Sequence, residues 1–191
     1  MSKNDNENRQ AFIREIIDSL AYNPASQFID VDKLWQNHQL SIKVSNLISK
    51  LIVAKFGSEK FSSIIAFDNL TYPFGPIPIA SHLSTILKIP LTIVKEGADP
   101  ITGRHKIYGF YPETSSLVFY DVTRFGLTAL RMIGFLHSEG IIPQYFITMV
   151  DCDQGAIDLL ARETSNKLGV NVKFHCLLKL GEIEKAYNKE G

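Results

Sequence analysis

A short apolar run that ends in an acid, followed by a glycine-containing turn and a helical pattern, most constrains the fold of this chain. Residues 117–120 are continuously apolar, which is typical of a buried strand in a parallel sheet, and Asp121 follows directly. After a turn that contains Gly126, apolar residues recur with helical spacing between Leu127 and Leu136. A strand, a loop and a helix in this order gather free backbone N–H groups at the helix N-terminus. The stretch therefore predicts a phosphate-binding loop at the carboxyl edge of a parallel sheet.

Strand and helix patterns alternate from Phe61 onward. Strands are expected at Ser62–Phe67, Leu91–Val94, Lys106–Tyr111, Leu117–Tyr120, Tyr145–Val150 and Val170–Leu178. Helices are expected at Ile79–Leu87, Gly126–Glu139, Gln154–Leu168 and Glu182–Tyr187. Right-handed crossovers then predict an α/β fold with a mostly parallel central sheet of about five strands and helices on both faces. The strands at 106–111 and 117–120 are separated by a short turn and are expected to pair with each other.

The N-terminal third predicts a small cap on this sheet. Residues 1–10 are polar and expected to be flexible, a helix follows and Asn23-Pro24 ends it. Residues 28–34 alternate apolar and acidic side chains and are expected to be extended. A second helix is expected from Ser41, a favourable N-cap residue, to Phe56. Residues 1–191 are expected to form one domain.

Composition and charge argue against several classes of partner. The 191 residues carry 20 basic and 20 acidic side chains, so no net charge indicates nucleic acid or an anionic membrane. No apolar run reaches the roughly 20 residues of a membrane-spanning helix, and the polar first ten residues lack the core of a signal peptide. Cys152 and Cys176 have no metal-ligand spacing and are expected to be buried free thiols of a cytoplasmic protein.

The central stretch resembles the phosphoribosyl-pyrophosphate-binding motif of type I phosphoribosyltransferases. That motif is a hydrophobic strand, two acids, an aliphatic residue, two positions, Thr, Gly, one position, then Thr or Ser. Asp121 matches the second acid, Val122 the aliphatic residue, Gly126 the glycine and Thr128 the final hydroxyl.

Two positions depart from this motif: Tyr120 replaces the first acid and Phe125 replaces a loop threonine. The resemblance implies that the acids hold ribose hydroxyls and that the loop holds the 5′-phosphate. The implied ribose- and phosphate-binding residues are Tyr120, Asp121, Thr123, Arg124, Phe125, Gly126, Leu127 and Thr128. The alternative is a strand-to-helix turn with an incidental acid.

The loop at residues 68–80 resembles the loop that holds pyrophosphate in this family. In the orotate phosphoribosyltransferase branch its end reads Gly-Gly-Ile-Pro-Leu-Ala, and residues 75–80 here read Gly-Pro-Ile-Pro-Ile-Ala. Pro76 removes one N–H donor. The implied pyrophosphate-loop residues are Asp68, Asn69 and Gly75. The alternative is a connection made rigid by proline.

A third segment resembles the Arg-Lys-Glu-x-Lys-x-His-Gly loop of the orotate branch. Lys95 and Glu96 match, whereas Val94, Ala98 and Pro100 replace the arginine, the loop lysine and the histidine. The lysine and histidine stabilise the charge on departing pyrophosphate, so their replacement removes electrostatic help.

The next polar residues, Arg104, His105 and Lys106, are candidate replacements for these cations; the alternative is a set of solvated charges. The implied catalytic set is therefore Asp121, Lys95, Arg104, His105 and Lys106.

The fourth segment follows the strand at 145–150. Asp151 matches the acid of an Asp-Arg pair near the base-binding edge, and Cys152 replaces the arginine. That replacement weakens the case for an anionic pyrimidine such as orotate. Asp153 is expected to be the N-cap of the helix that follows.

The resemblance covers nearly the whole chain and implies an orotate phosphoribosyltransferase-like homodimer that binds a ribose 5-phosphate or nucleotide ligand. With several motif residues replaced, transfer of phosphoribosyl from phosphoribosyl pyrophosphate to a base is expected to be weak or lost. The alternative is a fully active phosphoribosyltransferase of nucleotide biosynthesis or salvage with replacement loop residues. Mg²⁺ is the implied cofactor; no direct ligand is assigned, and Asp121 is a candidate to hold it through water.

Overall fold

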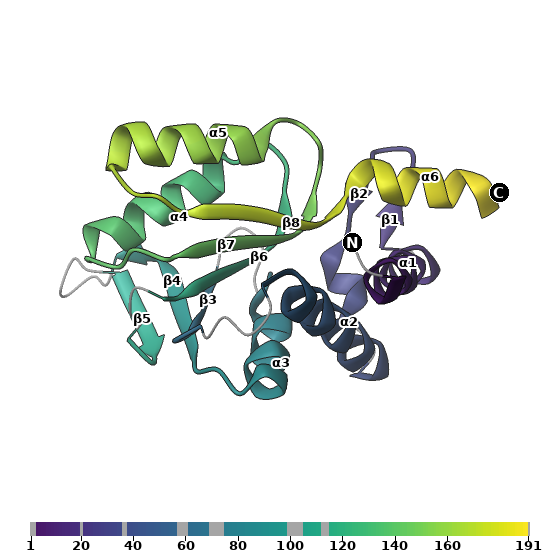
Figure 1. Cartoon of the computed structure of the whole chain (residues 1–191), viewed down its shortest axis with the longest axis horizontal. Helices are drawn as coiled ribbons and strands as arrows, with labels where there is room; N and C mark the ends of the chain where they lie inside the picture. The colour runs from purple at the N-terminus through teal and green to yellow at the C-terminus, as the bar shows by residue number, and fades with distance from the viewer. Residues whose placement is uncertain are drawn as a thin grey trace.

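A six-stranded sheet in the order β5-β4-β3-β6-β7-β8 forms the centre of the molecule (Figure 1). The computed structural model describes residues 3–19, 21–35, 38–56, 61–68, 75–98, 105–111 and 115–190. The strands are β3 (Ile64–Asp68), β4 (Leu91–Ala98), β5 (His105–Gly109), β6 (Leu117–Thr123), β7 (Tyr145–Asp151) and β8 (Lys173–Lys179). Five of them run parallel, and the predicted α/β class with a mostly parallel sheet is confirmed.

The predicted pairing of residues 106–111 with residues 117–120 is wrong. The strand β5 instead pairs antiparallel with β4, with Lys106 opposite Lys95. The strand β6 lies between β3 and β7. Its side chains Leu117, Val118 and Phe119 are fully buried, which favours a central position covered on both faces. The strand β5 leaves Tyr108 49% exposed, as an edge position allows.

Helices cover both faces of the sheet and enclose two core clusters. The helices α1 (Lys3–Asp18), α2 (His38–Phe56), α3 (Ile77–Leu87) and α6 (Leu180–Glu190) share one cluster with Leu117 and Phe119. The helices α4 (Leu127–Ser138) and α5 (Ala156–Glu163) cover the other cluster, which contains Val118. A short π-helix, Thr164–Leu168, ends the segment predicted as one helix at 154–168. Alternate residues of a strand point to opposite faces, so Leu117 and Phe119 of β6 pack in one core cluster and Val118 packs in the other.

The N-terminal cap differs from its prediction in three places. The helix α1 begins at Lys3, inside the segment expected to be flexible. Residues 28–34 are not extended throughout, because the two-residue strand β2 (Phe28–Ile29), which pairs with β1 (Tyr22–Asn23), is followed by a 3₁₀ turn at Val31–Leu34. Ser41 is not an N-cap: α2 already begins at His38, and the Ser41 hydroxyl donates to the His38 carbonyl at 2.9 Å.

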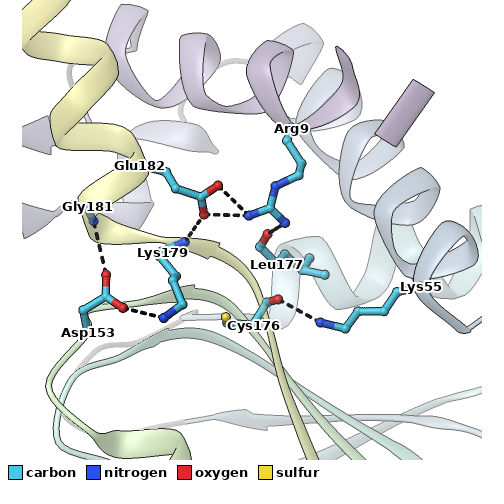
Figure 2. A network of polar contacts seen from close by, with 8 residues as sticks. All are labelled: Arg9, Lys55, Asp153, Cys176, Leu177, Lys179, Gly181 and Glu182. Carbon is cyan, nitrogen blue, oxygen red and sulfur yellow. Dashed lines mark hydrogen bonds and ion pairs between the residues drawn. The ribbon is translucent and has the colours of Figure 1, made fainter. Parts of the chain in front are cut away.

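Polar contacts tie the cap to the C-terminal end of the chain (Figure 2). The guanidinium of Arg9 in α1 donates to both carboxylate oxygens of Glu182 in α6, at 2.6 and 2.7 Å, and to the carbonyl of Leu177 in β8. The ring of Tyr22 packs edge-on against Tyr187 of α6, with 5.5 Å between centroids. The hairpin β1–β2 is therefore held between the two terminal helices.

None of the described helices is long and apolar enough to cross a membrane. Cys152 and Cys176 are both free thiols as predicted, although only Cys152 is fully buried. Burial raises the pKa of both thiols, so neither is activated as a nucleophile.

Candidate functional site

A cavity of about 420 Å³ lies between the cap and the carboxyl ends of β3, β6 and β7. The cap contributes one wall, and the sheet with its loops contributes the other. The lining residues are Gln27, Phe28, Ile29, Asp30, Val31, Asp32, Phe67, Gly75, Pro76, Tyr120, Asp121, Val122, Arg124 and Cys152. The carboxyl edge of a parallel sheet is where α/β proteins place their ligands, so this cavity is the candidate site.

The loop after β6 has the geometry of an anion-binding turn. Gly126 adopts a left-handed φ of 77° and is the residue before α4, whose first turn is built by residues 127–129. The N–H groups of a helix's first turn have no acceptor within the helix and favour an anion. A Cβ at Gly126 would also lie 3.2 Å from the Ala156 carbonyl oxygen and from Leu160 of α5. Glycine is therefore required here both by φ and by the close approach of α5.

Asp121 brings a carboxylate to the cavity from within β6. Its Oδ1 accepts a hydrogen bond from the Val122 N–H at 2.8 Å. Burial raises the pKa of Asp121 to about 6, and the charge of Asp32 across the cavity adds to the rise, against the stabilising hydrogen bond from Val122. At neutral pH Asp121 is mostly an ionised acceptor, suited to a hydroxyl donor such as a ribose diol.

The other predicted ribose- and phosphate-binding residues take different positions. Tyr120 and Arg124 line the cavity, and the Arg124 guanidinium carbon lies 5.9 Å from the centre of the Phe125 ring. Phe125 and Leu127 are 58% and 67% exposed on the loop. Thr128 is half-buried at the start of α4.

Thr123 ends β6 rather than opening the loop. It pairs with Asp151 in the ladder with β7, and its side chain is 2% exposed. Its hydroxyl has no hydrogen-bond partner among the described residues. Thr123 is not among the residues that line the cavity, so its role in phosphate binding stays a prediction.

The predicted pyrophosphate-loop residues are only partly brought to the cavity. Gly75 lines it, and Asn69 lies outside the described residues. Asp68 ends β3 opposite Lys95 of β4, and the Lys95 ammonium lies 4.0 Å from the Asp68 carboxylate. This pair lies at the carboxyl edge of the sheet, outside the cavity lining.

Two of the three candidate replacement cations lie in a strand, which was predicted for Lys106 but not for His105. His105 and Lys106 belong to β5, where their backbones pair with Ala98 and Lys95. The strand β4 continues to Ala98, four residues beyond its predicted end, and this extension draws residues 105 and 106 into a hairpin. Arg104 lies outside the described residues.

The structure corrects the assignment of Asp153 in the loop after β7. Asp151 is buried beside the cavity, burial raises its pKa, and its neighbour Cys152 forms the cavity wall. Asp153 does not cap α5, which begins after Gly155 without a side-chain cap. Its carboxylate instead accepts from the Lys179 ammonium at 3.0 Å and from the Gly181 N–H at 3.4 Å, at the start of α6 (Figure 2).

The cap wall at residues 27–32 is the part of the site that sequence reasoning missed. Its alternation of apolar and acidic residues predicts an extended segment and does not by itself indicate binding. One signal could have found it: Phe28, Asp30 and Asp32 place an aromatic and two acids within five residues, and Phe28 is 47% exposed. Only tertiary structure brings this segment over β6.

The described residues contain no group of three or more His, Cys, Asp or Glu side chains that could hold a metal ion. Mg²⁺ requires near-octahedral oxygen ligands, and Asp121 is the single carboxylate that β6 offers to the cavity. Binding of Mg²⁺ at Asp121 therefore stays a prediction.

Comparison with solved structures defines the class of this fold. The orotate phosphoribosyltransferase of Aeropyrum pernix matches with a TM-score of 0.66 at 22% identity, covering 86% of this chain and 85% of that chain. The Mycobacterium tuberculosis H37Rv orotate phosphoribosyltransferase in complex with 5-phospho-alpha-D-ribosyl 1-diphosphate matches with a TM-score of 0.60 at 18% identity, covering 96% and 93%. The fold is that of the type I phosphoribosyltransferases.

Sequence comparison names the family. The orotate phosphoribosyltransferase of Pyrococcus furiosus is 33% identical over 142 residues, 73% of this chain and 73% of that protein. No family model matches the chain. The chain belongs to the orotate phosphoribosyltransferase family.

Proposed function

We propose that this protein binds a ribose 5-phosphate or a nucleotide in the cavity, and that it transfers phosphoribosyl to orotate weakly or not at all. The observation that carries this proposal is the pairing of an intact β6–Gly126–α4 turn with the one carboxylate that β6 brings to the cavity, Asp121. The turn supports phosphate binding, and Asp121 supports binding of ribose hydroxyls. A relative's structure that holds 5-phospho-alpha-D-ribosyl 1-diphosphate supports a ribose-phosphate ligand.

Three features support weak transfer. Tyr120 occupies the cavity wall next to Asp121 and offers a phenol where a second acid would add charge. Lys95, which matches the lysine of the Lys-Glu pair in the family's loop, has its ammonium 4.0 Å from the Asp68 carboxylate. Cys152 gives the wall a thiol of raised pKa in place of a cation. Removing one preorganised charge contact commonly lowers turnover about 100–1000-fold, and several contacts are changed together here.

Binding is tested by calorimetric titration of the whole protein with ribose 5-phosphate at pH 8. Arg124→Ala should weaken binding about tenfold or more, because Arg124 is the cation of the cavity lining. The matched control is Arg162→Ala, which removes an exposed arginine of α5 that contacts Glu163 outside the cavity. Equal affinities of the two variants would contradict the placement of the phosphate.

Catalysis is tested by release of pyrophosphate from phosphoribosyl pyrophosphate with orotate and Mg²⁺. The expected rate is far below the 1–1000 per second of ordinary enzymes. A rate in that range would favour the second candidate, an active phosphoribosyltransferase with replacement cations. The register that places Lys106 opposite Lys95 favours this candidate, and Lys106→Ala would then abolish turnover.

We also propose a homodimer. The edge strand β5 and the residues that follow it expose three aromatic side chains, Tyr108, Phe110 and Tyr111, by 49%, 41% and 59%. Such an apolar edge supports association with a second copy. Light scattering after gel filtration should give twice the chain mass of 21.5 kDa, and Tyr108→Lys should shift the protein to the monomer.

A further inference from the structure

The charged residues of the cavity are distributed unevenly between its walls. The cap wall carries Asp30 and Asp32, and the sheet wall carries Asp121 and the cation Arg124. Lys33 lies 4.0 Å from Asp30 and partly offsets that carboxylate. No lysine or histidine is among the described lining residues. The cap wall is therefore acidic, and the cation of the lining comes from the loop that precedes α4.

The uncharged part of the lining suits a flat, apolar ring. Phe28, Phe67 and Tyr120 supply aromatic surface from the cap, from β3 and from β6. Cys152 contributes a buried thiol, which neither carries positive charge nor acts as a strong donor. A heterocycle placed against these residues would share the cavity with the carboxylates of Asp30 and Asp32, and Arg124 is the one cation among the described lining residues.

We propose that the base end of this cavity takes an amino-bearing, hydrogen-bond-donating heterocycle and rejects one that carries a carboxylate. This inference rests on the proposed function, in which the ribose phosphate occupies the loop end. Asp32 and Asp30 would accept hydrogen bonds from ring N–H and amino groups. The same carboxylates would repel an anionic base, and like-charge contacts in a partly desolvated site discriminate strongly against the wrong ligand.

The inference is tested with nucleoside monophosphates that share one ribose 5-phosphate and differ only in the base. Cytidine, uridine and orotidine 5′-monophosphates present an amino group, a neutral oxo group and a carboxylate. Calorimetric titration of the whole protein at pH 8, where their phosphates are equally charged, should rank them in that order. We expect the cytidine compound to bind at least tenfold more tightly than the orotidine compound.

Substitutions in the acidic wall test which residues cause the preference for one base over another. Asp32→Asn should narrow the difference between cytidine and orotidine monophosphates several-fold, and Asp32→Lys should narrow it further or reverse it. Asp30→Asn should have a smaller effect, because Lys33 already offsets that charge. The matched control is Asp158→Asn, since Asp158 is an exposed acid of α5 outside the cavity lining and should leave the ranking unchanged.

The outcomes separate this inference from the proposed function. If ribose 5-phosphate binds and orotidine monophosphate binds as tightly as cytidine monophosphate or more tightly, the inference is wrong and the proposed function stands. If Asp32→Asn leaves an observed preference unchanged, the acidic wall is not its cause and the inference is again wrong. If ribose 5-phosphate and all three nucleotides fail to bind, the proposed function is wrong and the inference falls with it.

Discussion

At the scale of single residues, two positions account for much of the site. Asp121 is a half-buried carboxylate that faces another acid across the cavity, and Gly126 is a left-handed residue packed against α5. Each residue serves the proposed ligand site, and each lowers the stability of the folded state: Asp121 through the burial of its charge and Gly126 through its left-handed backbone. Residues held in this way are common at functional sites, where the surrounding structure maintains an unfavourable local state.

The raised pKa of Asp121 predicts a pH-dependent stability. Its pKa rises from 3.8 to about 6 on folding, so the folded state binds the proton more tightly than the unfolded state. Its contribution is most favourable below about pH 4 and is lost as the pH rises through about 6. Asp121→Asn should therefore raise the melting temperature at pH 8 by a few degrees, since 1 kcal/mol corresponds to about 2–4 °C at this size.

The same substitution should have little effect on the melting temperature at pH 4, where Asp121 is protonated in the wild type. Thermal unfolding by circular dichroism at both values measures the difference. Asp158→Asn serves as the control at the surface. A stabilisation of Asp121→Asn that is equal at pH 4 and pH 8 would show that the carboxylate charge is not its cause.

Gly126→Ala is expected to destabilise the fold, and not only to impair binding. The substitution combines a left-handed φ with a contact of 3.2 Å to the Ala156 carbonyl, and overpacking alone commonly costs about 1–3 kcal/mol. Gly140→Ala is a matched control, because Gly140 has a φ of 75° but no atom within 4 Å of the added Cβ. Urea unfolding should show a larger loss for Gly126→Ala. Equal losses would mean that φ alone makes glycine necessary.

At the scale of elements, the terminal helices hold the wall of the cavity without lining it. The hairpin β1–β2 leads into the acidic cap wall and packs through Tyr22 against Tyr187 of α6. The helix α6 is in turn joined to α1 by Arg9 and Glu182, and to the loop after β7 by Asp153 and Gly181 (Figure 2). Residues from both ends of the chain thus position the cap against the sheet.

Arg9→Ala should weaken this arrangement. It removes hydrogen bonds to Glu182 and to the Leu177 carbonyl from a side chain that is 20% exposed, and loss of charged hydrogen bonds costs about 1–3 kcal/mol. Arg162→Ala removes an exposed contact and should change the unfolding free energy by less than about 0.5 kcal/mol. Urea unfolding measures both. A loss for Arg9→Ala no larger than that for Arg162→Ala would contradict a stabilising role of this network.

At the scale of the whole molecule, the cavity lies between two parts that ligand binding should hold together. Residues 27–32 belong to the cap, and Tyr120–Val122 belong to the sheet. A ligand in contact with both walls stabilises the closed arrangement and disfavours local opening of the cap. Ligand binding should therefore stabilise the N-terminal segment that forms the cap.

Hydrogen exchange tests this link. Saturating ribose 5-phosphate should slow exchange of backbone amides in residues 27–34 and at the start of α4. Amides of β5, which lies at the far edge of the sheet from the cavity, should be unaffected. Slower exchange at α4 alone would show that the ligand is held by the loop without the cap.

The local units and the class of fold follow from the pattern of residues along the chain. Apolar runs at 64–67 and 117–119, and a run at 145–150 interrupted only by Thr148, predict buried strands, and the helix after Gly126 follows from its apolar spacing. These signals arise from interactions close in sequence and from burial on both faces, which a pattern of side chains records directly. The same local information placed Tyr120, Asp121 and Arg124 at the end of β6, where the cavity lies.

The contacts between segments that are distant in the sequence depend on tertiary packing. Strand order depends on the relative burial of whole strands, so the pairing of β5 with β4 could not be read from the short turn before β6. Asp153 binds the N-terminal end of α6 instead of α5, because β8 brings Gly181 beside it from 28 residues away. The acidic cap wall reaches the cavity for the same reason: α1 and α6 hold its hairpin over the sheet. Contacts of this kind leave no periodic pattern in the nearby sequence, because the two partners meet only when the elements pack together. They therefore cannot be predicted from local residue patterns.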